Sequence, residues 1–484
     1  MASRPNILFI TLDQFRADSM SCAGHPVVRT PNLDVLAAEG VRFARHYAQA
    51  APCAPGRAAL YTGTYQMNNR VVANGSPLDH RFDNVARAAR RAGYEPVLFG
   101  YTDQGVDPRT VGRDDPGLWN WEGVLPGFEC IVNLDERYVP WMEFLHEHGY
   151  SGDDPEAALA TENERPIELS VSTFMTDRML QWMGEQDKPW FAHASYLRPH
   201  PPFSAAGEYS TMYDPTVCPA PLPVLEHQHP LYSAMLQIPY VAAPADPLLM
   251  AELRAQYYGM ISEVDMHLGR VWEQLRRTGQ WDDTIIVVTA DHAEQLGDQG
   301  LLHKLGFFES SYHILNIIRD PRSAGASGSV VHAFTENVDI MPTLCEMMEL
   351  PVPLQCDGVS LTPFLRGEDA GEGWRTAASY EWDWRDQFIG RGAVEEPGER
   401  RLERQHLTVR RSDSFAYVQF GDGSWRCFDL AADPTWRTEV TDPAIVLALA
   451  QEMLVWRTEH NDRTLSGMLL RDGGVGRWPD PVPA

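Results

Sequence analysis

The chain alternates short apolar runs with stretches of helical periodicity. Residues 6–13, NILFITLD, form a continuous apolar run that ends in a carboxylate, and their length and β-branched content favour a buried strand. Residues 284–291, TIIVVTAD, repeat this pattern. Residues 30–40 begin with Thr-Pro and end in glycine, as many helices do. Strands alternating with helices predict an α/β fold with a large, doubly wound, mostly parallel sheet flanked by helices.

Other segments extend this pattern or interrupt it. Residues 41–50 alternate like a strand, and residues 248–283 form the longest helix candidate, which we expect to break near Gly259. Residues 106–164 are irregular and predict an insertion or long loops over one face of the sheet. Residues 201–247 form a second irregular, proline-rich stretch, and we expect both segments to shape a pocket. Candidates for an apolar pocket wall, with core packing as the alternative, are Trp119, Trp121 and Trp141.

The pattern changes beyond about residue 358. Residues 406–434 read as short alternating strands joined by turns, which predicts a small antiparallel sheet. Residues 443–459 predict an amphipathic helix. We therefore expect an α/β domain over residues 1–357, a small α+β subdomain over 358–440, and a C-terminal helix and tail over 441–484. The apolar stripe of the helix consists of Ile445, Leu449, Met453 and Trp456.

Composition and charge narrow the classes of partner. Hydrophobic residues make up 44% and charged residues 22% of the 484 positions, as in ordinary globular proteins. The net charge of −27 argues against a nucleic-acid partner, because a polyanion requires a basic surface. The seven cysteines occur singly, without a C-x-x-C pair, which predicts reduced thiols and a cytoplasmic location. We see no signal peptide and no apolar run long enough to span a membrane.

Two of the predicted strands end in an aspartate that is followed by another metal-binding residue type. Asp13 precedes Gln14, and Asp291 precedes His292. In a doubly wound sheet, ligands bind beyond the carboxyl ends of the strands, so both pairs are expected at one rim. Two carboxylates, an amide oxygen and an imidazole suit a divalent cation. The alternative for each aspartate alone is a cap of a strand-to-helix turn.

The segment PCAPGR places Cys53 in the first turn of a predicted helix. A helix N-terminus favours an anionic ligand, and Arg57, four positions on, lies on the same helix face, where its fork can hold a tetrahedral anion. Together with a metal ion, this predicts a centre for phosphoryl or sulfuryl chemistry. The alternatives are a buried structural cysteine and a thiolate nucleophile. Cysteine-dependent phosphatases require a longer spacing between cysteine and arginine.

The residues of CAPGR match the C-x-P-x-R signature of the sulfatase family, so the chain resembles a member of that family. Supporting motifs run in the family order along almost the whole chain, from PNILFITLDQFRADSM through TPNLDVLAAEGVRF and DDTIIVVTADHAEQLGD to CFDLAADP. The pairs DQ and DH and the motifs NRVVANGSPLD, GYTD, YLRPHPPF and LLHKLGF are similar to the branch of phosphonate monoester hydrolases and related bacterial arylsulfatases.

The resemblance implies a modified nucleophile and a metal ion. A formylglycine-generating enzyme would convert Cys53 to formylglycine, whose hydrate attacks sulfur or phosphorus with one hydroxyl and uses the second to release the bound anion. The side chain of residue 53 would also complete the shell of one divalent ion, whether calcium, manganese, magnesium or zinc. The other implied ligands are Asp13, Gln14, Asp291 and His292.

The resemblance also implies roles for residues around the nucleophile. Arg57 would orient residue 53, His200 would act as general acid, and Lys304 would stabilise charge. Each surrounding position has a structural alternative: a turn at Asn74, strand-end packing at Tyr101, a rigid loop at His200 and a solvated charge at Lys304. The positions predicted to contact substrate are Asn74, Tyr101 and Asp103.

Three positions depart from the family pattern. Ala293 replaces a usual glycine, and Gln299 stands where a histidine is common. Asp103 stands where a threonine or histidine is expected to contact substrate, and a carboxylate beside an anion site is unusual. We expect Asp103 either to form a salt bridge with a neighbouring base or to alter the choice of substrate.

The resulting functional hypothesis is hydrolysis of a small anionic ester. We rank sulfate esters first, as in arylsulfatases, with phosphonate monoesters and phosphodiesters close behind because they share a tetrahedral anion. A non-catalytic anion-binding protein is the alternative from another class. Metal-dependent phosphatases and phosphomutases are a third hypothesis, but they use serine or threonine as nucleophile. Because relatives form dimers or tetramers, we expect a homodimer or homotetramer in which the helix near Ile445 and the tail around Trp478 contact a neighbouring subunit. The alternative is that they pack on the chain's own core.

Overall fold

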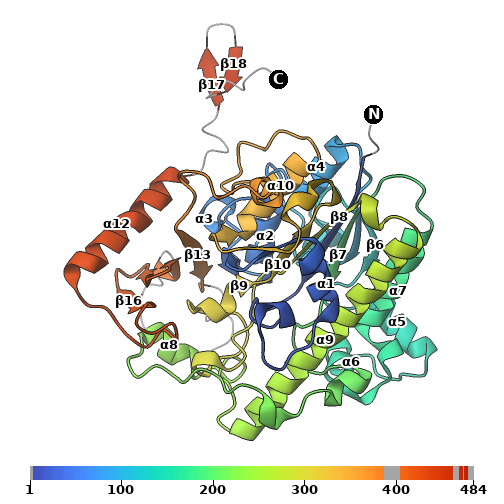
Figure 1. Ribbon diagram of the computed structural model, residues 1–484, viewed down its shortest axis with the longest axis horizontal. Coiled ribbons are helices and arrows are strands. Elements are labelled where there is room, and N and C mark those ends of the chain that lie inside the picture. The colour runs from blue at the N-terminus through green and yellow to red at the C-terminus, as the bar shows by residue number, and fades with distance from the viewer. Residues whose placement is uncertain (1–3, 386–403, 462–467, 472–473, 478–484) are drawn as a thin grey trace.

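The computed structural model describes residues 4–385, 404–461, 468–471 and 474–477 (Figure 1). Its centre is an eight-stranded sheet. The predicted α/β fold with a large sheet is confirmed. In spatial order the strands are β11 (Ser329–Val331), β2 (Val41–Phe43), β10 (Asn316–Arg319), β8 (Thr284–Thr289), β1 (Asn6–Leu12), β7 (Phe191–Tyr196), β5 (Val97–Gly100) and β6 (Glu129–Asn133).

The middle of this sheet is parallel, as the apolar runs predict. β1 pairs in parallel with β7 on one side and β8 on the other, and β5 and β6 continue the parallel arrangement. β10 is antiparallel to both of its neighbours, β8 and β2. Every residue of β1, β7 and β8 is buried, which explains why these strands lack a polar face in the sequence.

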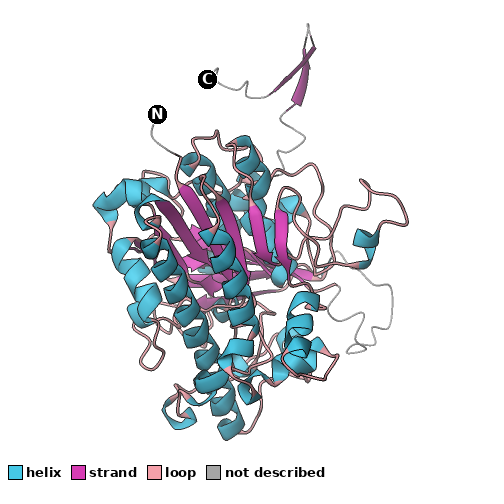
Figure 2. Ribbon diagram, turned by 90° about the vertical axis from the view of Figure 1, so that its right-hand side faces the viewer, coloured by secondary structure: helices cyan, strands magenta, loops and turns pink. Residues whose placement is uncertain are grey.

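Helices cover both faces of the sheet (Figure 2). Alternate residues of β1 point to opposite faces, so Leu8 and Ile10 belong to one apolar core and Ile7 and Phe9 to another. The first core includes side chains of α1 (Pro31–Glu39), α5 (Val139–Glu147), α6 (Pro155–Ala160), α7 (Val171–Gly184), α8 (Pro230–Met235) and α9 (Pro247–Arg277). The second includes α2 (Cys53–Thr62), α4 (Val85–Arg91), α10 (Ile340–Met347) and α11 (Thr362–Leu365).

A smaller, five-stranded sheet lies toward the C-terminus, where the sequence predicts antiparallel strands. Its four long strands are antiparallel, and β4 adds to it in parallel with β13. The helix α12 (Pro443–Glu459) packs on this sheet through the predicted stripe, with Leu449, Met453 and Trp456 buried. The strands are β16 (Trp425–Asp429), β15 (Phe415–Phe420), β14 (His406–Ser412), β13 (Ala377–Asp383) and β4 (Ala50–Ala51).

Short elements complete the described part of the chain. α3 (Gln66–Asn69) follows α2, a three-stranded sheet has the order β12 (Thr335–Glu336), β3 (His46–Tyr47), β9 (His313–Ile314), and β17 (Met468–Arg471) pairs with β18 (Gly474–Arg477). The predicted subunit contact through Trp478 lies outside the described residues. Within the described ranges, every helix is too short or too polar to cross a bilayer.

Three predictions about local structure are wrong. Residues 41–50 are three short strands, β2, β3 and β4, which belong to three different sheets. Alternation predicts extended backbone but carries no information about the pairing partner, which tertiary contacts supply. Residues 106–164 also contain more than loops, since β6 forms an edge of the main sheet and α5 and α6 pack on its core.

The third error concerns Gly259, where α9 continues without a break for 31 residues. A Cβ atom added at Gly259 would lie 2.3 Å from the carbonyl oxygen of Tyr209 and 2.8 Å from the Cβ of Ala205. This glycine therefore permits close packing of a loop on the helix and does not interrupt it.

We predict that Gly259→Ala lowers the free energy of unfolding by about 1–3 kcal/mol, because overpacking outweighs the helix propensity of alanine. Urea titration followed by circular dichroism measures this change. The control is Gly184→Ala in α7, where the nearest atom to an added Cβ is Gln274 Nε2 at 3.5 Å. The control should remain within about 1 kcal/mol of wild type; equal effects of the two variants would contradict the packing argument.

Candidate active site

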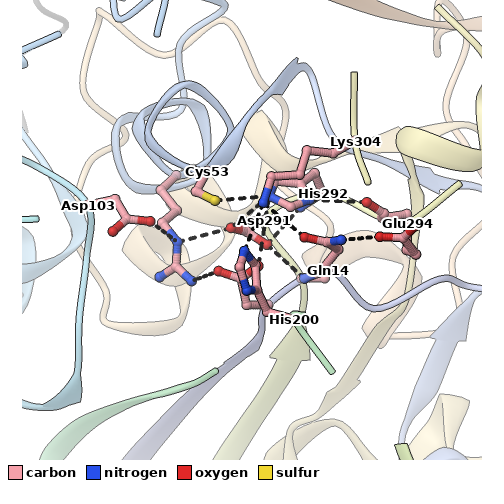
Figure 3. Close-up of polar contacts among 12 residues, drawn as sticks. Gln14, Cys53, Asp103, His200, Asp291, His292, Glu294 and Lys304 are labelled. Atoms are coloured by element: carbon pink, nitrogen blue, oxygen red, sulfur yellow. Dashed lines mark hydrogen bonds and ion pairs between the residues drawn. The ribbon is translucent and has the colours of Figure 1, made fainter. Parts of the chain in front are cut away.

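The two predicted aspartate pairs meet at the carboxyl ends of neighbouring parallel strands. β1 and β8 pair in register from Asn6 and Thr284 to Thr11 and Thr289, so the residues that follow each strand emerge side by side. The backbone N–H of Gln14 donates to Asp291 Oδ1 at 3.2 Å, across 277 positions of sequence. The strand ends thus bring Asp13, Gln14, Asp291 and His292 together as predicted (Figure 3).

Helix α2 brings the cysteine to this rim. It begins at Cys53, directly after β4, and all ten of its residues are buried. Gly56 permits the approach, because an added Cβ would lie 2.6 Å from the carbonyl oxygen of Asp291 and 3.0 Å from that of Ala50. The Cys53 side chain ends 3.3 Å from His292 Nε2, and the residue is only 6% exposed.

The assembled donors fit a divalent cation. One ligand atom from each of Asp13, Cys53, Asp291 and His292 lies within 4.8 Å of the others, and all four residues are buried. Among the described residues Asp13 Oδ1 has no hydrogen-bond partner, although it is buried. Burial lowers the pKa of His292 to about 3, so its imidazole is neutral. A neutral imidazole and carboxylate oxygens are ordinary ligands of divalent ions.

The guanidinium of Arg57 binds three buried carboxylates. Its Nη2 lies 2.9 Å from Asp13 Oδ2, and its Nε lies 3.0 Å from Asp291 Oδ2 and 3.3 Å from Asp103 Oδ2. Its Nη1 donates to Ser195 Oγ at 2.7 Å. Burial raises the pKa of both Asp103 and Asp291 to about 7, despite the attraction of Arg57. The site therefore holds more negative charge than one guanidinium offsets, as a cation site does.

Lys304 and His200 form another edge of the site, at which Lys304 carries the positive charge. Lys304 Nζ lies 2.9 Å from Gln14 Oε1 and 3.0 Å from His200 Nε2. His200 Nδ1 lies 2.6 Å from the carbonyl oxygen of Pro201, which can only accept, so Nδ1 carries the proton and Nε2 accepts from Lys304. Burial and the charge of Lys304 hold the pKa of His200 well below its usual range.

Asn74 and Tyr101 also reach the site. Asn74 Oδ1 accepts from the backbone N–H of Ala54 at 3.0 Å and so supports the first turn of α2. The Tyr101 hydroxyl donates to Asp13 Oδ2 at 2.7 Å, and its ring centroid lies 4.4 Å from the Arg57 guanidinium carbon. Their contact with substrate stays a prediction; Tyr101 contacts Asp13, a proposed metal ligand, and Asn74 contacts Ala54, the residue after Cys53.

The departures from the family pattern have different environments. Asp103 forms the expected salt bridge with Arg57, while its Oδ1 has no hydrogen-bond partner in the described part of the chain. Ala293 is fully buried, and its N–H donates to the carbonyl of Ser311. The backbone of Gln299 bonds to Leu222 and Tyr232 in the predicted loop segment.

The three tryptophans proposed for a pocket wall differ from one another. Trp141 is fully buried in the core, and its indole N–H donates to the carbonyl of Leu169. Trp119 is 84% exposed. Trp121 donates to Glu136 and lies against Gly75, next to Asn74, so it has the position closest to the predicted role.

The structure adds residues that the sequence analysis does not identify. Arg198 donates from Nη1 to the carbonyls of His200 and Pro202 and pairs with buried Glu162, so it shapes the His200 loop. Glu294 accepts a hydrogen bond from the amide nitrogen of Gln14. Glu294 follows Asp291, His292 and Ala293 directly in the sequence, which is a signal that it lies near the site. This adjacency does not reveal which way its side chain points.

Comparisons with known proteins agree with this site. A model of the sulfatase family matches residues 5–350, and one of the C-terminal region of N-sulphoglucosamine sulphohydrolase matches residues 297–457. The chain therefore belongs to the sulfatase family. It is similar to the multifunctional alkaline phosphatase superfamily protein PehA of Trinickia caryophylli, with 37% identity over 502 residues. This alignment covers 96% of the present chain and 97% of PehA.

Two solved structures are similar over almost the whole chain. The phosphonate monoester hydrolase of Agrobacterium radiobacter has a TM-score of 0.88 and 40% identity, covering 99% of this chain and 100% of its own. The phosphonate monoester hydrolase of Silicibacter pomeroyi has a TM-score of 0.88 and 35% identity, covering 98% and 99%. Together with the family match, these neighbours show a hydrolase that acts on sulfate or phosphonate esters.

We predict that Arg57→Lys lowers the free energy of unfolding by about 3 kcal/mol, because a point charge cannot replace the fork that binds three buried carboxylates. Urea titration of the metal-free protein measures the loss. The control is Ser195→Ala, which removes one neutral acceptor of the same guanidinium and should cost about 1 kcal/mol. A loss in Arg57→Lys no larger than in the control would contradict the central role of the guanidinium.

Proposed function

We propose that the protein hydrolyses monoanionic esters of tetrahedral oxyacids, with phosphonate monoesters and phosphodiesters as its first class of substrate and sulfate monoesters as the second. This order reverses the ranking drawn from the sequence. It is supported by the two phosphonate monoester hydrolases that match 99% and 98% of the chain at 40% and 35% identity.

The observation that supports the proposal most directly is the net charge of the buried side chains at the sheet rim, beside the start of α2. Three buried carboxylates, Asp13, Asp103 and Asp291, face the cationic side chains of Arg57 and Lys304. With all three carboxylates ionised, these five side chains carry one net negative charge, which a bound divalent ion would convert to one net positive charge. A site with this balance favours a monoanionic ester over a dianionic phosphate monoester.

Residue 53 is proposed to be formylglycine. When present, its hydrate supplies one hydroxyl that displaces the alcohol and a second that later breaks the bond between residue 53 and the anion. An unmodified thiol is poorly suited to the same task, because burial and the neighbouring carboxylates raise the pKa of Cys53 well above its usual value.

The divalent ion is proposed to be held by Asp13, Gln14, Asp291 and His292 with residue 53, and when bound it supplies positive charge to the reacting oxygens. Arg57 orients the two aspartates relative to the first turn of α2. Asn74 fixes that turn through the Ala54 N–H.

Lys304 and His200 are proposed to assist the leaving group. Lys304 Nζ donates to His200 Nε2 at 3.0 Å, so a departing alkoxide can take its proton from Lys304, either directly or after that proton has passed to His200 Nε2. Lys304 also places a positive charge beside the anion. The convergence of this pair with the metal donors and Cys53 disfavours a purely anion-binding protein on the same fold.

Sulfate monoesters remain the second candidate because the family model that covers residues 5–350 is that of the sulfatases. A sulfate monoester carries one negative charge, like a phosphodiester, so the same charge balance accepts both. The proposed partner during synthesis is a formylglycine-generating enzyme, and a homodimer or homotetramer is the proposed assembly.

We predict that protein made together with a formylglycine-generating enzyme yields a peptide around residue 53 that is lighter than its cysteine form. Mass spectrometry of the digested protein measures the fraction converted, and hydrolytic activity should rise in proportion to it. Cys53→Ala, made in the same host, is the control and should lose activity. Full activity with only unmodified thiol would refute the proposed nucleophile.

A second prediction concerns the substrate class. Four nitrophenyl substrates are compared: a phenylphosphonate monoester, a phosphodiester, a sulfate monoester and a phosphate monoester. We expect kcat/KM to be highest for the phosphonate monoester and lowest for the dianionic phosphate monoester. Removal of divalent ions by a chelator should abolish turnover of all four, and added metal should restore it. A phosphate monoester as fastest substrate would contradict the charge argument.

A further inference from the structure

Glu294 occupies a buried position between the metal-binding rim and the loop that carries Lys304. Its Oε2 accepts from Gln14 Nε2, and its Oε1 accepts from the backbone N–H groups of Leu296 at 2.8 Å and His303 at 2.6 Å. The residue is fully buried. Glu294 therefore uses both oxygens as acceptors, one for the Gln14 side chain and one for the backbone (Figure 3).

The Gln14 amide is held from its other side as well. Gln14 Oε1 accepts from Lys304 Nζ at 2.9 Å. The Gln14 backbone is anchored through its N–H to Asp291 Oδ1 and through its carbonyl to the Tyr257 hydroxyl at 2.8 Å. It adopts a left-handed conformation with a φ of 69°. The amide thus presents its nitrogen to Glu294 and its oxygen to the centre of the site (Figure 3).

We propose that Glu294 is a positioning residue that aims the Gln14 amide oxygen at the divalent cation and requires an uncharged amide at position 14. This inference rests on the metal site of the proposed function. It adds a residue outside the set of ligands, which acts on the cation through Gln14.

A carboxylate meets this requirement, whereas an amide does not. The backbone N–H groups of Leu296 and His303 need an acceptor on one side of residue 294, and the Gln14 amide needs an acceptor on the other. A glutamine at position 294 has only one acceptor oxygen, which can serve either the backbone N–H groups or the Gln14 amide but not both. Its NH₂ group would face either the backbone N–H groups or Gln14, and in the second case Gln14 would turn its own NH₂ toward Lys304 and the cation.

The same geometry excludes a carboxylate at position 14. A glutamate there would place its charge against Glu294 in a fully buried contact, where like charges repel strongly and water cannot screen them. A neutral ligand at position 14 adds no further negative charge to the rim, where Asp13, Asp103 and Asp291 are already buried. Glu294 in this way links the identity of one ligand to the net charge of the site.

A double-mutant cycle in zinc affinity tests the proposal. The full-length variants Glu294→Gln, Gln14→Glu and the combination of both are titrated with zinc in competition with a chromophoric chelator. We expect each single variant to bind zinc about tenfold more weakly than wild type. In the combination, the new amide at position 294 donates to the new carboxylate at position 14, so zinc should bind more tightly than in Gln14→Glu alone. The sign of the Glu294→Gln effect thus reverses with the residue at position 14.

The matched control is Glu336→Gln. Glu336 is also a buried carboxylate that accepts from a backbone N–H, that of Ser379 at 2.7 Å, and from a side chain, the Tyr65 hydroxyl at 2.6 Å. Its partners Ser379, Tyr65 and Arg375 are not proposed metal ligands, so its variant should lower the melting temperature without changing zinc affinity. Glu294→Asp serves as a second variant if Glu294→Gln fails to fold, and it should also bind zinc more weakly because its shorter side chain reaches only one side.

Two outcomes would overturn the inference alone. One is a lower melting temperature of Glu294→Gln with unchanged zinc affinity, which would show a purely structural role. The other is Gln14→Glu binding zinc as tightly as wild type, which would show that position 14 needs no neutral ligand. A wild-type chain that binds no zinc and needs no divalent ion for hydrolysis would overturn the proposed function together with the inference.

Discussion

The contact of one buried guanidinium with three carboxylates is the interaction on which the site depends. Arg57 lies on α2, while its partners Asp13, Asp103 and Asp291 follow the strands β1, β5 and β8. Four elements that are far apart in the sequence are therefore held at one rim. Because unpaired buried charges are costly, each carboxylate also constrains where α2 can begin, and with it the position of residue 53.

Much of this arrangement was accessible from the sequence. The apolar runs of β1 and β8 predict buried strands of a mostly parallel sheet, and the rule that ligands bind at the carboxyl ends of strands predicts that Asp13 and Asp291 lie at one rim. The proline and glycine pattern around Cys53 predicted a helix start. These inferences hold because they depend on local pattern and on a general property of parallel sheets.

The remainder depends on contacts that a local pattern does not encode. Residues 41–50 have the alternation of one strand, yet three different partners divide them among three sheets. Gly259 permits a close approach of the Tyr209 backbone, which lies 50 positions earlier in the sequence. Glu294 stands beside a predicted ligand in the sequence, but its contact with Gln14 follows from the fold of the 294–304 loop. Sequence reasoning finds such residues only when their partners are already known.

The burial of α2 determines when residue 53 can be modified during the synthesis and folding of each molecule. Cys53 is 6% exposed, and its helix rests on the Asp291 carbonyl through Gly56, so a folded chain presents little of this side chain to an outside enzyme. If residue 53 is converted, the conversion belongs to the interval between synthesis and folding. A preparation would then be a mixture of two permanent populations, and its specific activity would record how fast modification ran relative to folding.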